Sequence, residues 1–180
     1  ILRVEKEDSR PGGAGNVVLN LLSLGAEVIA LGRIGNDSGG LLLRRQLQES
    51  GADVSALIIQ EDYLTPIKNR LIAGGQQLMR VDKEKIMPLS AAKEASLIRQ
   101  LPLILQNVQI VAVSDYAKGF LSENFLQQMI QQAQECCVPV LVDPKGDDFK
   151  KYRGAYLIKP NLQEAYAAAH LSKEVSLAEV

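Results

Sequence analysis

The sequence predicts an α/β protein built on a doubly wound, mostly parallel sheet. Its apolar residues gather in short runs at 28–31, 110–113, 138–142 and 156–158, which have the length of buried strands. Short buried strands that alternate with helices are typical of a parallel sheet with helices on both faces. Helical periodicity between these runs predicts helices over residues 17–24, 40–50, 90–100, 122–135 and 161–169.

Turn residues mark where several of these elements begin and end. The segment 35–39 contains Asp37 just before a helical pattern, which predicts an N-cap with its turn. The segment 54–59 is strand-like. Residues 65–72 and 77–82 are also strand-like, and the glycines 74 and 75 between them predict a hairpin.

The composition is that of a globular protein and argues against several classes of partner. The 180 residues are 47% hydrophobic and 23% charged, with a formal net charge of -1. A near-neutral chain has no general electrostatic attraction to nucleic acid or to an anionic membrane. No apolar run reaches the roughly 18–20 residues of a membrane span, and no signal-peptide pattern is found.

The cysteines and the histidine indicate the cellular environment and argue against one kind of metal site. Cys136 and Cys137 are adjacent, and neighbouring cysteines rarely bridge each other, so we expect both to be reduced in a cytoplasmic protein. The single histidine, His170, argues against a His-rich metal site.

The two ends of the chain suggest a piece of a longer protein. Residues 1–4 alternate like a strand, without an initiator methionine, and Ser176 with Glu179 has the spacing of a capping box. We therefore expect residues 1–180 to be one partial domain that is incomplete at both ends.

A glycine-rich segment precedes the first predicted helix. Gly12 and Gly13 let the backbone approach a ligand closely, and Asn16 can form paired hydrogen bonds with sugar hydroxyls. The alternative is a plain turn with Asn16 as a cap. The segment matches neither the dinucleotide fingerprint nor a P-loop, which needs Gly-Lys-Ser/Thr.

Polar clusters follow three of the predicted strands, where parallel sheets bind ligands. Asp143 and Lys145 supply a carboxylate and an ammonium, as phosphoryl transfer requires, or else a simple ion pair. Asn161 and Glu164 form either a capping box or a site for hydrated Mg²⁺, and the two uses can coexist. Asp115 lies in a polar loop at the same edge.

Three cations of the predicted hairpin are a further candidate site. Lys68, Arg70 and Arg80 are either solvated or able to receive a substrate phosphate.

Taken in order, these motifs resemble the ribokinase-like (phosphofructokinase-B type) sugar kinase family. The resemblance rests on Gly-Gly-x-x-Asn at 12–16, Gly-x-Asp at 35–37 and Asn-x-x-Glu at 161–164. Four longer strings are similar to the subgroup that phosphorylates a heptose 7-phosphate; they lie at residues 10–14, 76–82, 114–119 and 143–155.

The resemblance implies a Rossmann-like core with a small β lid, here residues 1–10 and 65–82, whose strands form a homodimer contact. It implies ATP and Mg²⁺ as cofactors and transfer of the γ-phosphate to a sugar phosphate. The implied substrate-binding residues are Gly12, Gly13, Asn16, Lys68, Arg70, Arg80 and Asp115. The implied ATP site comprises Asp143, Lys145, Asn161 and Glu164, with Asp143 and Glu164 near the metal through water.

The sequence departs from the family in one respect. The family's catalytic base is the aspartate of a Gly-Ala-Gly-Asp motif, and this chain contains no such motif. We therefore name no catalytic base and expect the 180 residues alone to be inactive. Two alternatives remain: another sugar kinase of the family, such as a ribokinase or a ketohexose-phosphate kinase, or a non-catalytic sugar-binding fragment.

Overall fold

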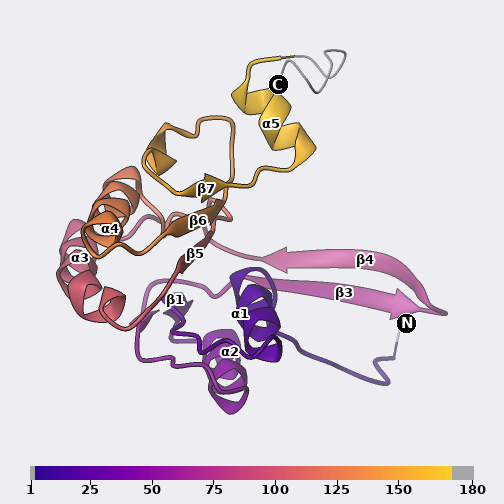
Figure 1. Cartoon of the computed structure of the whole chain (residues 1–180). Helices are drawn as coiled ribbons and strands as arrows, with labels where there is room; N and C mark the ends of the chain where they lie inside the picture. Colours follow the sequence, from indigo (N-terminus) through magenta and orange to yellow (C-terminus); the bar gives the residue numbers. More distant parts are fainter. Residues whose placement is uncertain (1–2, 172–180) are drawn as a thin grey trace. The chain divides into compact units, whose positions relative to one another are not determined.

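The computed structural model describes residues 3–171 and shows an α/β fold (Figure 1). The chain divides into two compact units, Ile1–Lys85 and Ile86–Val180, and each is considered by itself. The predicted capping box at 176–179 lies outside the described residues.

The first unit contains two helices, a parallel strand pair and a hairpin. Strand β1 pairs in parallel with β2, from Gly32 opposite Leu57 to Gly35 opposite Gln60. Buried Ala30, Leu47 and Val54 form the core beneath the helices. The elements are α1 (Ala14–Ser23), β1 (Gly32–Gly35), α2 (Ser38–Glu49), β2 (Leu57–Gln60), β3 (Ile67–Ala73) and β4 (Gln76–Lys83).

The predicted hairpin is confirmed. Strands β3 and β4 pair antiparallel, with Lys68 opposite Asp82 and Arg70 opposite Arg80. The turn residues Gly74 and Gly75 have φ values of 57° and 79°. A two-residue hairpin loop of type I′ needs positive φ at both positions, which glycine adopts without a steric penalty.

The N-cap predicted within 35–39 is confirmed, and Asp37 is the residue that caps α2; it also holds the segment that leads into β3. Its Oδ1 accepts a hydrogen bond from Gly40 N at 2.8 Å, and its Oδ2 accepts one from Thr65 N at 2.9 Å. The hydroxyl of Thr65 in turn accepts a bond from Gly35 N at 2.9 Å. A Cβ on Gly40 would clash with the Gly35 carbonyl, so the close approach requires glycine there.

The second unit is a three-stranded parallel sheet with its helices. The strand order is β5-β6-β7, with Ser114 opposite Asp143 and Val142 opposite Ile158. The elements are α3 (Ala91–Leu105), β5 (Val111–Ser114), α4 (Glu123–Glu135), β6 (Val140–Asp143), the 3₁₀ turn η1 (Lys150–Tyr152), β7 (Leu157–Ile158) and α5 (Leu162–Ala168).

Helix α4 shows how sequence pattern becomes packing. Ser122 caps it by accepting a bond from Phe125 N at 3.0 Å. The apolar face predicted from the spacing is the buried face, because residues three and four apart share one side of a helix. Its buried residues are Phe125, Leu126, Met129, Ile130 and Ala133.

Several predicted boundaries were wrong. The strand predicted at 54–59 is observed at 57–60. Residues 3–10 contain no strand, because none of their backbone groups bonds to the backbone of another described segment. The run 28–31 forms no strand, and its one bridge joins Ile29 to Asp53. A turn, closed by a hydrogen bond from Leu57 N to Val54 O, interrupts the parallel pairing, which resumes at Gly32 as β1. Helix α3 continues past residue 100 to Leu105 and accommodates Pro102.

Candidate active site

The carboxyl ends of the parallel strands in the second unit bring the predicted polar clusters together. Asp115 follows β5, and its backbone N–H donates to the carbonyl of Asp143, the last residue of β6, at 3.0 Å. Lys159 follows β7, and its ammonium lies 3.2 Å from Oδ1 of Asp143. Ends of adjacent parallel strands thus form one polar edge, as α/β sheets generally do at ligand sites.

The loop after β6 contacts the start of α5. Lys145 Nζ lies 3.0 Å from Oε1 of Glu164. The ion pair foreseen for Lys145 therefore exists, but its partner is Glu164 and not the neighbouring Asp143.

The first turn of α5 is a capping box. Asn161 Oδ1 accepts a bond from Glu164 N, and Glu164 Oε2 accepts one from Asn161 N, both at 3.0 Å. Burial raises the pKa of Glu164, but the bonds from the Asn161 backbone and from Lys145 outweigh it, so the pKa falls below its usual value. Glu164 is accordingly held as an anion at the helix N-terminus, where negative charge is favoured.

Asp115 has a buried carboxylate that accepts three hydrogen bonds from the protein. Its side chain accepts bonds from Lys151 Nζ at 2.7 Å, from the Tyr152 hydroxyl at 2.6 Å and from Ala117 N at 2.7 Å. Burial raises the pKa of Asp115, yet the bonds from Lys151 and Tyr152 bring it below its usual value. For Lys151, burial lowers the pKa, but the contact with Asp115 raises it overall.

A pocket of about 510 Å³ lies beside this network. Its walls carry both signs of charge, so a ligand there would meet ammonium groups and carboxylates together. The lining residues are Glu123, Lys145, Gly146, Asp147, Asp148, Lys150 and Lys151.

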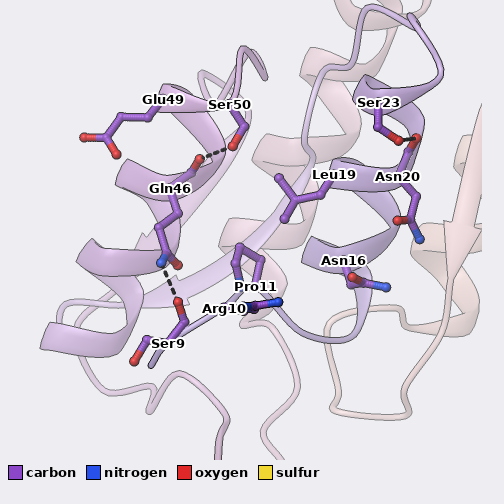
Figure 2. A pocket seen from close by; sticks show the side chains of 10 residues that line it. All are labelled: Ser9, Arg10, Pro11, Asn16, Leu19, Asn20, Ser23, Gln46, Glu49 and Ser50. Carbon is purple, nitrogen blue, oxygen red and sulfur yellow. Dashed lines mark hydrogen bonds between the residues drawn. The ribbon is translucent and has the colours of Figure 1, made fainter. Parts of the chain in front are cut away.

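In the first unit, the glycine-rich segment forms the start of α1. Gly13 is the N-cap residue, with a φ of 52° that favours glycine, and no side chain caps the helix. The alternative that made Asn16 the cap is therefore wrong: Asn16 lies in the first turn of α1. Asn16 lines a pocket of about 530 Å³ between α1, α2 and the preceding segment, where Gln46 of α2 donates to Ser9 O at 2.8 Å (Figure 2).

The hairpin cations are partly paired within the hairpin. Lys68 and Arg80 both contact Asp82, at 2.7 Å and 2.9 Å. Arg70 lies opposite Arg80, and among the residues that the structure describes it forms no ion pair.

Sequence reasoning assigned no role to Lys151, Tyr152 and Lys159. Tyr152 is fully buried and its hydroxyl joins two loops, but its sequence neighbours give no sign of this. For Lys159, the sequence offered one indication of a role: the residue precedes Pro160 at the end of a predicted strand.

The described carboxylates do not form a direct metal cage. Within residues 3–171, no group of three or more His, Cys, Asp or Glu side chains is arranged to hold a metal ion. Mg²⁺ commonly keeps several waters and binds one or two carboxylates together with substrate phosphates. The partly exposed carboxylate of Asp143 suits that kind of contact, whereas both oxygens of Glu164 are engaged by Lys145 and Asn161.

Comparison with known proteins identifies the family to which these motifs belong. The model of the pfkB family carbohydrate kinases matches residues 1–180, and the chain therefore belongs to that family. A curated relative, the bifunctional protein HldE of Syntrophotalea carbinolica, is 41% identical over 172 residues, which cover 96% of this chain and 35% of the relative. The chain thus spans about a third of the length of the curated relatives it matches.

Solved structures confirm the predicted fold class. The tetrameric inhibited form of phosphofructokinase-2 from Escherichia coli superposes with a TM-score of 0.72 at 20% identity, covering 99% of this chain and 60% of that one. Arabidopsis thaliana ribokinase, complexed with ribose and ATP, gives 0.66 at 16% identity, covering 92% and 53%. No helix among the described residues is long and apolar enough to span a membrane.

Proposed function

We propose that this chain carries the sugar-phosphate site and part of the nucleotide site of an ATP-dependent kinase. The substrate is D-glycero-β-D-manno-heptose 7-phosphate, which becomes the 1,7-bisphosphate on the route to ADP-heptose and the lipopolysaccharide core. The observation that carries the proposal is the contact of Lys145 with Glu164, which joins two family motifs at one edge of the sheet. The strings at 10–14, 76–82, 114–119 and 143–155 support this substrate.

On the nucleotide side, Lys145, whose ammonium contacts Glu164, would contact the phosphates of ATP. Phosphoryl transfer depends on positive charge placed where negative charge develops. Asp143 is the carboxylate we assign to Mg²⁺ through water, with Glu164 joining when a phosphate displaces it from Lys145. Asn161 fixes the orientation of Glu164 through the capping box.

On the sugar side, Gly12, Gly13 and Asn16 would contact hydroxyl groups beside the start of α1. The hairpin would hold the substrate's own phosphate. Like charges directly opposite each other on paired strands are destabilising, and Arg70 faces Arg80. A phosphate dianion between the two guanidinium groups would remove that repulsion and accept paired hydrogen bonds.

The same hairpin supplies the surface for the proposed homodimer. Leu71 lies opposite Met79, and Val81 is two positions from Met79 along β4; the three residues are 37%, 57% and 46% exposed. Covering these apolar side chains with a second copy would remove them from water. Sedimentation of the wild type and of Met79→Glu distinguishes the proposed dimer from a monomer, and we expect the variant to be monomeric. An unchanged oligomeric state would mean that the contact lies elsewhere.

The decisive experiment is a phosphate-transfer assay with ATP and a panel of sugars and sugar phosphates. It uses the protein expressed from its complete reading frame, in a reducing buffer suited to the proposed cytoplasmic location. We expect the heptose 7-phosphate to have the highest kcat/KM. Preference for ribose or a ketohexose phosphate would favour another member of the family, and absence of any turnover would favour the non-catalytic alternative.

A further inference from the structure

The Tyr152 hydroxyl lies between two loops that the sequence separates. It is 2.6 Å from Oδ2 of Asp115 and 3.1 Å from the backbone nitrogen of Lys145. A backbone N–H can only donate, so the tyrosine oxygen accepts a hydrogen bond from Lys145 N, and its O–H donates one to Asp115. The direction of both bonds is thereby fixed.

The carboxylate of Asp115 is already occupied by the protein. One oxygen accepts from Ala117 N, and the other accepts from both Lys151 and Tyr152, while the residue is only 5% exposed. Each carboxylate oxygen has two lone pairs, so Oδ1 could accept one further bond. Because the residue is only 5% exposed, a sugar hydroxyl has little access to that oxygen.

Tyr152 is held in place by its burial and by the contact of η1 with α4. Tyr152 is fully buried, and its ring lies 6.1 Å from that of Phe149. Gln127 of α4 donates to the carbonyl of Lys151 at 2.9 Å, which fastens the 3₁₀ turn η1 to the helix. The Tyr152 hydroxyl is therefore a fixed point against which the loop after β6 is held.

Lys145 is fixed at both ends. Its backbone N–H is bonded to Tyr152, and its ammonium contacts Glu164. A loop cation restrained in this way loses less conformational freedom when it binds a phosphate, which is how preorganised sites gain affinity.

We propose that Asp115 is a positioning residue that acts through Tyr152 on the backbone of Lys145, and that it does not bind the sugar. The effect of this positioning on ATP binding rests on the proposed kinase function, because it requires that Lys145 contacts the phosphates of ATP. The anchoring of the loop itself can be measured without any turnover.

The first test is amide hydrogen exchange at Lys145 in the complete protein. In wild type we expect the Lys145 amide to exchange more slowly than that of Asp147, which has no hydrogen-bond acceptor among the described residues. Tyr152→Phe keeps the ring and removes the hydroxyl, so exchange at Lys145 accelerates about tenfold or more, as expected for loss of one buried bond. Tyr156→Phe is the matched control, because Tyr156 is 78% exposed.

The second test separates positioning from sugar binding by steady-state kinetics. Tyr152→Phe and Asp115→Asn should both raise the KM for ATP about tenfold while changing the KM for the sugar phosphate less than twofold. An increase in the sugar KM alone in Asp115→Asn, with unchanged exchange at Lys145, overturns the proposal. So does a wild-type Lys145 amide that exchanges as fast as Asp147, a result that needs no variant to fold. Absence of turnover in wild type refutes the proposed function, while the exchange result still decides the anchoring.

Discussion

The ammonium of Lys145 lies 3.0 Å from a carboxylate oxygen of Glu164, nineteen positions further along the chain. This ion pair connects the loop after β6 to the first turn of α5. Because Glu164 also completes the capping box with Asn161, one carboxylate serves the helix start and the neighbouring loop together.

Replacing Glu164 by Gln should change how stability depends on pH. The pKa of Glu164 in the folded protein lies below its ordinary value of 4.5, so the ionised carboxylate stabilises the fold above that pH. The contribution disappears as the pH falls through the lowered pKa, when both states become protonated. Thermal unfolding should show a wild-type advantage over Glu164→Gln that is full above about pH 5.5 and shrinks below 4.5.

The matched control is Glu135→Gln, at the end of α4, where the carboxylate is exposed and accepts only a bond from Gln131. Its unfolding temperature should follow wild type across the range. A constant difference between wild type and Glu164→Gln at every pH would mean that the ion pair contributes nothing.

Removing the carboxylate of Asp37 should destabilise the first unit. Asp37→Ala loses the cap of α2 and the acceptor for Thr65 N, and loss of an N-cap alone costs about 0.5–2 kcal/mol. Urea denaturation should therefore show a loss at or above the upper end of that range.

Asp53→Ala is the comparison for this variant, because exposed Asp53 accepts a single backbone bond from Ser55 at 2.8 Å. Exchange at the Thr65 amide should accelerate in Asp37→Ala and stay unchanged in Asp53→Ala. A loss within the N-cap range with an unaffected Thr65 amide would assign Asp37 to the helix cap alone. A loss no larger than that of Asp53→Ala would contradict the prediction.

These features differ in how far the sequence reveals them. The buried face of α4, the cap at Asp37 and the hairpin at Gly74 follow from local periodicity and turn chemistry, and the sequence predicts each of them. Strand pairing depends on a distant partner: the run at 28–31 is apolar enough for a strand, but the turn between Val54 and Leu57 moves the ladder to Gly32.

The candidate site shows the same division. The spacing of Asn161 and Glu164 predicts their capping box, because both bonds are local. The bond between Tyr152 and Asp115 spans 37 positions and depends on the register of β5 with β6, so no local pattern indicates it. Consequently the sequence assigned Asp115 to the sugar, whereas its contacts support the positioning role proposed above.

The 180-residue chain by itself should show no measurable ATP-dependent phosphate transfer. It contains no Gly-Ala-Gly-Asp motif, so no residue takes the place of the family's catalytic base. General-base assistance contributes about 10²–10⁴-fold, and loss of the backbone anion hole removes more. A coupled assay on the isolated chain, beside the protein from the complete reading frame, measures the difference. Robust turnover by the isolated chain would require a base among its own residues.

The most direct prediction about the substrate concerns Arg70 and Arg80. Arg80 shares Asp82 with Lys68, at 2.9 Å and 2.7 Å, while Arg70 faces Arg80 across the hairpin. The carboxylate of Asp82 thus balances part of the charge, and the hydrogen bond from Lys68 lowers its pKa below the usual value. A planar guanidinium suits a phosphate better than an ammonium does, so the arginines are the first candidates.

Changing Arg70 or Arg80 to Ala should weaken binding of the sugar phosphate and leave ATP affinity nearly unchanged. A charge-assisted contact of about 1.5–3 kcal/mol corresponds to a loss of about 10- to 150-fold. Calorimetric titration of the complete protein with the heptose 7-phosphate and, separately, with ATP measures both affinities. Arg99→Ala is the control, because Arg99 is an exposed arginine of α3. If the side chains are merely solvated on the outer face of the hairpin, both variants will bind the sugar phosphate as wild type does, and its phosphate must then be held by residues outside β3 and β4.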